Sequence, residues 1–273
     1  MVTRRLPIPT AEEARIAASG RVERSTMTDD ERWESYLIPG TSRVLRNKLD
    51  SSDPYGVRDY QLLDTLESEI TLGKVDDLLT RPIRGNFDLE HMQRIHRYLL
   101  GDVYDWAGQI RDVNMSKRDV AYASHDRIET IWKTEHARIA KRRFLRQSDS
   151  TENFALGLAR FWGEVNHAHA FREGNTRSQM VFFEQLADQA GRSLAIERFA
   201  PQHPASLYDT FVDARFYFQR SGDLEPLAEV IMKALSQPDN PQRVAATRRF
   251  PELGDMRIDR SDSSEIQDQP ELG

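Results

Sequence analysis

Two apolar helical stripes that flank a short glycine-containing loop constrain the fold of this chain more than any other sequence feature. The first stripe comprises Phe154, Leu158, Phe161, Trp162 and Val165. The second begins near Thr176, comprises Val181, Phe183, Leu186, Ala187 and Ala190, and ends at Gly191. Residues at this spacing share one face of an α-helix, and that face must be buried against other elements. The pattern predicts two packed helices of a mainly α fold.

Other segments also carry helix signals. Asp88 can cap a helix whose apolar face comprises Leu89, Met92, Ile95 and Leu99. Capping-box patterns begin at Thr10 and at Thr28 and predict two short N-terminal helices. A basic cluster of Lys141, Arg142, Arg143 and Arg146 lies where a helix that begins near Arg127 should end, and cations there stabilise the helix dipole. We therefore expect a helical bundle.

The segment 109–124 has a different pattern. Its apolar residues, Ile110, Val113, Met115, Val120 and Tyr122, are interleaved with polar ones. This alternation is typical of paired strands rather than of a helix. We expect a short β-hairpin here, and from these residues alone a plain surface hairpin is the simplest interpretation.

Composition argues against several classes of protein. The net charge of -6 argues against a general nucleic-acid binder. No run of apolar residues approaches the roughly 18 that suggest a membrane span. The N-terminus has no apolar stretch behind Arg4 and Arg5, which argues against a secretory signal, and the lack of cysteine is compatible with a reducing compartment. We expect a cytoplasmic protein, and delivery to a target cell by a specialised secretion system is compatible with these features.

The loop at 169–177 combines residue types that active sites use. An imidazole such as that of His169 transfers protons near neutral pH, and the carboxylate of Glu173 can hold a divalent cation. Gly174 and Asn175 favour a turn whose N–H groups join the positive end of the following helix, which suits phosphates. The residues alone leave simpler interpretations open: a packed or capping histidine, a solvated acid and an ordinary turn.

A zinc site is a further alternative. His167 and His169 would point the same way in an extended segment, and Glu164 precedes them by about one helical turn. A catalytic zinc ion usually has three protein ligands, and no third His or Cys stands at a recognisable spacing. We therefore do not favour a zinc site.

The loop resembles the signature of the Fic family, H-P-F-x-(D/E)-G-N-G-R-x-x-R. It matches at His169, Phe171, Glu173, Gly174, Asn175 and Arg177. Ala170 replaces the Pro, Thr176 replaces the second Gly, and Met180 replaces the last Arg. Segments 36–41, 44–49 and 103–111 are similar to the family's opening segments, and the resemblance covers residues 36–235.

This resemblance implies a mainly α, Fic-type helical bundle with a short β-hairpin flap over the active site. It divides the chain into N-terminal helices with an inhibitory-type motif at 1–35, a Fic domain at 36–235 and a C-terminal tail at 236–273. The tail is polar and is punctuated by Pro238, Pro241, Pro251 and Pro270. We predict that it is disordered.

The activity implied is AMPylation, the transfer of AMP from ATP and Mg²⁺ to a hydroxyl side chain of a target protein. His169 would be the general base that deprotonates a Ser, Thr or Tyr hydroxyl, and Glu173 would hold the Mg²⁺. The nucleotide-binding residues would be Phe171, Gly174, Asn175, Thr176 and Arg177. The flap residues Val113, Asn114, Met115, Ser116 and Lys117 would align a target segment by strand addition.

The departures from the signature point toward a weaker enzyme. Thr176 and Gln179 form a capping-box pattern, which predicts Thr176 as the N-cap, and its hydroxyl and Cβ would then weaken phosphate binding. Met180 offers neither charge nor donor where the family's last Arg holds the terminal phosphate. The alternative function is a catalytically weakened Fic domain that binds a nucleotide or a target protein, or that uses a different nucleotide donor.

The segment 19–24 resembles the Fic inhibitory motif (S/T)-x-x-x-E-(G/N), which is found in a small antitoxin or within the same chain. Ser19 and Glu23 match it, and Arg24 replaces the small last residue. In the family this Glu pairs with the last Arg of the signature, where this chain has Met180. We expect antitoxin-like regulation, in cis or in trans, to be weak at most. An ordinary amphipathic helix with a solvated Glu23 is the alternative.

Overall fold

The structure, a computed structural model, describes residues 24 and 26–236. The described residues fall into two units, one that ends at Leu45 and one that begins at Arg46. In the first unit, α2 (Asp29–Ser35) begins after Thr28, whose hydroxyl accepts a hydrogen bond from the N–H of Glu31 while the Glu31 carboxylate accepts from the N–H of Thr28. The capping box predicted at Thr28 is confirmed. The helix predicted from Thr10 and the motif with Ser19 and Glu23 lie outside the described residues.

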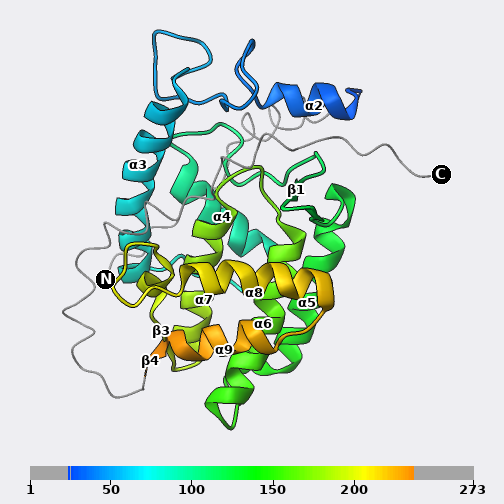
Figure 1. The fold of residues 1–273 in the computed structure, drawn as a ribbon, viewed down its shortest axis with the longest axis vertical. Coiled ribbons are helices and arrows are strands. Elements are labelled where there is room, and N and C mark those ends of the chain that lie inside the picture. The colour runs from blue at the N-terminus through cyan, green and yellow to red at the C-terminus, as the bar shows by residue number, and fades with distance from the viewer. Residues whose placement is uncertain (1–23, 25, 237–273) are drawn as a thin grey trace. The chain divides into compact units, whose positions relative to one another are not determined.

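The second unit is a helical bundle with two small antiparallel strand pairs (Figure 1). Its α-helices are α3 (Tyr60–Thr80), α4 (Leu89–Leu100), α5 (Ile128–Lys141), α6 (Thr151–Ala168), α7 (Asn175–Gln189), α8 (Tyr208–Ser221) and α9 (Glu225–Ala234). Short 3₁₀ turns are η1 (His125–Arg127), η2 (Arg143–Leu145) and η3 (Ile196–Phe199). Strand β1 (Ser116–Lys117) pairs with β2 (Val120–Ala121), and β3 (Ser193–Leu194) pairs with β4 (Leu235–Ser236).

The structure bears on the predicted fold class, on membrane spans and on the predicted C-terminal tail. The mainly α fold with a small hairpin is confirmed. No helix in the described part of the chain is long and apolar enough to cross a membrane. Of the tail predicted at 236–273, only Ser236 is described, and it belongs to β4.

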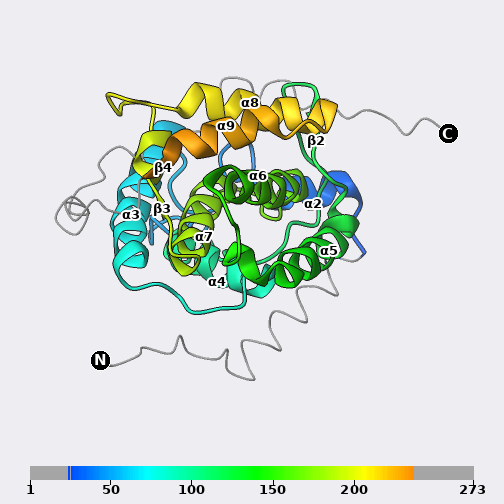
Figure 2. The same ribbon diagram turned by 90° about the horizontal axis from the view of Figure 1, so that it is seen from below.

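Helix α6 lies at the centre of the second unit, with α5, α7, α8 and α9 around it (Figure 2). Its residues permit this because bulky and small side chains alternate on its faces. A Cβ at Gly163 would lie 2.5 Å from Phe218 of α8, so only glycine allows that helix to approach so closely. Trp162 stacks on Phe183 of α7, with ring centroids 4.6 Å apart. The C-terminal end of α6 is thereby held on several sides.

Of the helix starts predicted in the second unit, the one at Asp88 is confirmed and the cap at Thr176 is not. The Asp88 side chain caps α4 by accepting from the N–H of His91 at 2.8 Å, as predicted. Helix α7 begins at Asn175 with Gly174 as its N-cap, and no side chain caps it. The prediction of Thr176 as an N-cap with Gln179 is therefore wrong. Gln179 instead accepts a hydrogen bond from the buried indole N–H of Trp162 at 3.1 Å.

The predicted hairpin is present and shorter than its sequence pattern. Ser116 pairs with Ala121 across the two strands. The connecting residues Arg118 and Asp119 both have positive φ, 49° and 57°, as a two-residue hairpin turn of type I′ requires. The N–H of Tyr122 donates to the carbonyl of Met115 at 2.9 Å and extends the pairing beyond the strands.

Candidate active site

The loop between α6 and α7 is shaped by two residues in left-handed backbone conformation. His169 ends α6 with φ 42°, and its N–H donates to the carbonyl of Val165 at 3.1 Å. Gly174 starts α7 with φ 76°, and a Cβ there would lie 2.1 Å from Cδ1 of Leu100. Only glycine fits this second position, because both the backbone angle and the space exclude a side chain.

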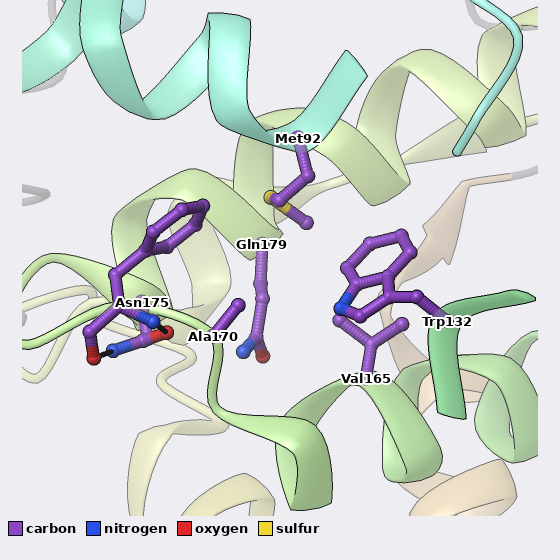
Figure 3. Close-up of a pocket in the computed structure, with 7 residues that line it drawn as sticks. Met92, Trp132, Val165, Ala170, Asn175 and Gln179 are labelled. Carbon is purple, nitrogen blue, oxygen red and sulfur yellow. Dashed lines mark hydrogen bonds between the residues drawn. The ribbon is translucent and has the colours of Figure 1, made fainter. Parts of the chain in front are cut away.

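Asn175 holds the loop closed through its side-chain amide. Its Oδ1 accepts from the N–H of Phe171 at 3.0 Å, and its Nδ2 donates to the carbonyl of the same residue at 2.6 Å. Figure 3 shows the packing behind the loop, where Met92, Trp132 and Gln179 border a gap too small to admit a water molecule. The side chain of Asn175 is therefore committed to the loop, and the space behind it is part of the core.

His96 of α4 contacts the loop next to Gly174 and connects it to residue Gly108. Its Nδ1 accepts from the N–H of Gly108 at 2.8 Å, and its Nε2 lies 2.8 Å from the carbonyl oxygen of Glu173. A carbonyl can only accept, so the proton of His96 is on Nε2 and the ring is neutral. Burial lowers the pKa of His96 to about 4, which favours the neutral form of the ring.

His169 presents a buried imidazole that stacks on Tyr122, with ring centroids 3.7 Å apart and planes 15° from parallel. Its Nδ1 is buried and has no hydrogen-bond partner among the described residues. Burial, followed by the cations of Arg111 and Arg215, lowers the pKa of His169 well below its usual value, against a smaller opposite effect of Glu173. The ring is therefore neutral at physiological pH and can accept a proton.

Arg111 joins the flap to the end of α6. Its guanidinium donates hydrogen bonds to the carbonyl groups of Val113, Ala123, Ala168 and His169, the last at 2.7 Å from Nε. Its own N–H donates to the carbonyl of Ala170 at 2.9 Å. The planar, always charged guanidinium suits a buried site where several carbonyl groups converge.

Glu173 and Arg177 lie next to each other at the start of α7, with 3.7 Å between the Glu173 Oε1 and a guanidinium nitrogen of Arg177. The Glu173 side chain is 13% exposed, and its Oε1 accepts from the N–H of Gly174 at 3.0 Å. Arg177 also forms a buried ion pair with Glu67 of α3 and donates to the hydroxyl of Thr71 at 3.1 Å. Arg177 is thus largely committed to α3.

The two departures from the signature are both inside the protein. Thr176 is buried in the first turn of α7, and Met180 is 1% exposed one turn later. The first intrahelical backbone bond runs from the N–H of Ser178 to the carbonyl of Gly174 at 3.1 Å. The N–H groups of the first α7 turn precede that bond and form the positive end of the helix.

The predicted docking residues of the flap differ in their access to solvent. Val113 is buried, so its side chain does not face a target protein. Its carbonyl accepts a hydrogen bond from Arg111. Asn114 is exposed, although its Oδ1 accepts from the N–H of His125 at 3.1 Å. Met115, Ser116 and Lys117 are half-buried. The accessible part of this set therefore lies at 114–117.

Sequence reasoning missed residues that reach the loop from other elements. These are Glu67, His96, Arg111 and Tyr122, none of which is in the signature. Arg111 ends a segment similar to the family's opening segments and Tyr122 belongs to the alternating pattern of the hairpin, but neither signal shows a contact with the loop. Within the described ranges, no group of three or more His, Cys, Asp or Glu side chains could hold a metal ion.

The chain is similar in sequence to known proteins over a region that includes the loop at 169–177. Residues 86–187 match the family model described as Fic/DOC family. The chain is 34% identical over 202 residues to a protein of Sinorhizobium fredii named Probable protein adenylyltransferase y4lH, and the match covers 74% of this chain and 96% of that protein. It is 35% identical over 160 residues to Protein adenylyltransferase VbhT of Bartonella schoenbuchensis, covering 54% of this chain and 33% of VbhT.

The fold has a counterpart among solved structures. BepC of Bartonella tribocorum, described as a VirB-translocated effector protein and solved with bound AMPPNP, has a TM-score of 0.63 and 22% sequence identity. The similarity covers 74% of this chain and 97% of that one. At this identity the similarity concerns the fold, and the family follows from the sequence matches. The chain belongs to the Fic/DOC family.

Proposed function

We propose that this protein is an adenylyltransferase that moves AMP from ATP to a hydroxyl side chain of a target protein. Family membership supports this proposal, as do the names of its relatives and the AMPPNP bound to BepC. The observation that carries it is the loop itself. A neutral imidazole at His169, a partly exposed carboxylate at Glu173 and the positive end of α7 lie together within it.

In the proposed reaction, the target hydroxyl oxygen attacks the α-phosphorus of ATP. The bond between that phosphorus and the oxygen bridging to the β-phosphate breaks, and pyrophosphate leaves with the bonding electrons. His169 accepts the hydroxyl proton, and we assign this role to Nε2 because Nδ1 is the buried ring nitrogen. The lowered pKa keeps the ring ready to accept that proton at neutral pH.

The first turn of α7 would bind the phosphates. Its N–H groups precede the first intrahelical bond, to the carbonyl of Gly174, and the helix dipole favours an anion there. Glu173 would hold Mg²⁺, which when bound neutralises phosphate charge. One partly exposed carboxylate fits this ion, because Mg²⁺ is usually bound by one or two carboxylates together with substrate phosphates.

The flap would receive the target protein. A two-stranded sheet such as β1 and β2 has outer edges to which an extended segment can add. Residues 114–117 comprise β1 and the two residues before it. We assign alignment of the target segment to the backbone of these residues. The target would supply a Ser, Thr or Tyr hydroxyl to His169.

A weakened enzyme is the second candidate function. The residues Met180 and Arg177, where the terminal phosphate would bind, favour it. Met180 is a buried thioether at the position of the signature's last Arg, and Arg177 is paired with Glu67. Binding of the terminal phosphate would then depend mainly on backbone N–H groups. Such a protein would bind nucleotide or target with slow transfer, or would prefer another donor.

Regulation and location extend the proposal. Ser19 and Glu23 would form an antitoxin-like segment, acting in cis or replaced by a separate chain in trans. We propose a cytoplasmic protein that can be delivered to a target cell, as the description of BepC as a translocated effector suggests.

The test uses two forms of labelled ATP in a cell lysate. Compared with lysate alone, adding the protein should bring label from the α-phosphate onto protein bands and no further label from the γ-phosphate, because pyrophosphate leaves. Parallel lanes with α-labelled GTP, UTP and CTP identify the donor. Label from the γ-position alone would indicate a kinase and contradict the proposal, and label from no donor would favour the binding alternative.

A further inference from the structure

The ring of Tyr122 stacks on the imidazole of His169, the proposed base. The proposed reaction assigns no role to this tyrosine. The two rings are nearly parallel, and their centroids are separated by only 3.7 Å. Tyr122 is 9% exposed and His169 is 4% exposed, so the stacked faces are shielded from solvent. The two residues come from different parts of the fold, since Tyr122 follows β2 of the flap and His169 ends α6.

The flap determines where the tyrosine ring lies. The N–H of Tyr122 donates to the carbonyl of Met115 on the opposite side of the hairpin, at 2.9 Å. The N–H of the next residue, Ala123, donates to the carbonyl of His167 in the last turn of α6, also at 2.9 Å. Backbone bonds on both sides therefore fix the tyrosine relative to the hairpin and to the helix end.

Arg111 strengthens the same connection. It donates two of its hydrogen bonds to carbonyl groups at the base of the flap and two to carbonyl groups at the end of α6. Its guanidinium is buried, so water competes little for these bonds. The hairpin cannot shift relative to His169 without breaking contacts to this one cation.

The imidazole of His169 lacks the usual means of orientation. A catalytic base is commonly oriented by a hydrogen bond to a third group. In the described part of the chain no partner bonds to Nδ1 of His169. The face of Tyr122 restrains rotation of the ring, because a turn of the imidazole out of its plane would collide with the tyrosine.

We propose that Tyr122 is a positioning residue whose ring fixes the plane of the His169 imidazole. Because the flap carries that ring, the hairpin proposed to receive the target segment also orients the base. This inference rests on the proposed function of His169. It assigns to the flap a side-chain role in the reaction in addition to backbone alignment of the target.

Three variants separate positioning from simple packing. Tyr122→Phe keeps the ring and removes only the hydroxyl, whereas Tyr122→Leu removes the planar surface. Phe154→Leu is the matched control, because it removes a fully buried ring at the opposite end of α6. Steady-state transfer to the target is measured for each, with kcat and the KM for ATP determined separately, alongside thermal stability.

We expect Tyr122→Leu to lower kcat by about tenfold to a hundredfold, the range expected when a reacting group is misplaced, with little change in the KM for ATP. Tyr122→Phe should retain kcat close to that of the parent. Phe154→Leu should lower thermal stability and leave kcat nearly unchanged. A kcat for Tyr122→Leu no lower than that of Phe154→Leu, or an equal loss in Tyr122→Phe, would overturn the inference.

A second measurement does not depend on transfer. The ring protons of His169, assigned by comparison with His169→Gln, should show an upfield ring-current shift in NMR spectra of the parent and of Tyr122→Phe. The shift should be lost in Tyr122→Leu. If the parent transfers no nucleotide, the proposed function fails while this shift still reports on the stack, and spectra without it would overturn the positioning role.

Discussion

The guanidinium of Arg177 forms an ion pair with the carboxylate of Glu67, and both side chains are almost completely buried, at 9% and 2% exposed. The same carboxylate accepts a hydrogen bond from the hydroxyl of Tyr104. The arginine of the loop signature is thus already balanced by a carboxylate on α3. Any nucleotide phosphate must compete with Glu67 for this cation.

We predict that Glu67→Gln lowers stability and tightens ATP binding at the same time. Removing one partner of a buried ion pair typically costs about 3 to 5 kcal/mol. The released charge of Arg177 becomes available to phosphates. Urea unfolding and titration calorimetry measure the two effects, with Glu135→Gln as the control, because Glu135 pairs with Arg138 and not with the loop. Weaker ATP binding by Glu67→Gln would show that Glu67 orients Arg177 for phosphate instead of competing.

Arg111→Lys should destabilise the protein although the charge is kept. Arg111 donates from three separate nitrogens, Nε to His169, Nη1 to Val113 and Nη2 to Ala123 and Ala168, and the single nitrogen of a lysine cannot replace all four bonds. Each buried carbonyl left without a donor costs about 1 to 3 kcal/mol, so we expect a loss of roughly 3 kcal/mol. Urea unfolding measures it, and Arg192→Lys, a half-buried arginine that donates to Thr151, should cost much less. Equal losses in both variants would contradict the joining role of Arg111.

Gly174→Ala should destabilise the loop for two separable reasons. The positive φ costs about 1 to 3 kcal/mol for a residue with a side chain, and the new methyl group would collide with Leu100. In the double variant with Leu100→Ala, the collision is removed and the backbone strain remains. We therefore predict that the double variant loses less stability than the sum of the two single variants. Additive losses would mean that the two side chains do not meet.

Acid should destabilise the protein from just below neutral pH. Burial lowers the pKa of His96 from 6.5 to about 4, and the pKa values of His91 and His169 are lowered as well. The unfolded chain then binds protons first, so this stability is present above pH 6.5 and is lost as the pH falls toward 4. For His96 alone the loss is on the order of 3 kcal/mol.

The pH dependence is tested by urea unfolding between neutral and acidic pH. His96→Gln removes one of the buried groups, and its stability should fall less steeply below pH 6.5 than that of the parent. A parent whose stability is flat down to the range where carboxylates titrate would contradict the buried neutral state of these histidines.

Much of the fold could be predicted because its signals are local. Asp88 caps its helix, and the stripe from Phe154 to Val165 is buried as its spacing indicates. Helix α3 was missed for a physical reason. Its buried face includes Glu67 and Thr71, whose polar side chains interrupt the apolar pattern because they bind Arg177.

The sequence predicted the site residues that lie in one continuous segment. It did not predict the contacts between segments that are distant in the sequence. His169, Glu173, Gly174 and Asn175 form one continuous segment, and the structure places them in one loop. Tyr122 reaches His169 only because the hairpin folds back onto α6, and no local pattern shows that contact. Thr176 failed as an N-cap because α7 already begins at Asn175 with Gly174 as its N-cap, and the Gln179 side chain bonds to Trp162 of α6 instead.

The most direct test of the account is single-turnover transfer by His169→Ala. Loss of a general base typically lowers the rate by about 10² to 10⁴, whereas binding of ATP, measured by calorimetry, should be nearly unchanged because His169 does not hold the phosphates. The parent and the variant are compared with α-labelled ATP on the same target, after their folding is matched by circular dichroism. We predict loss of label with retained ATP affinity. Label transferred by His169→Ala at the parent's rate would contradict the central claim that His169 is the base.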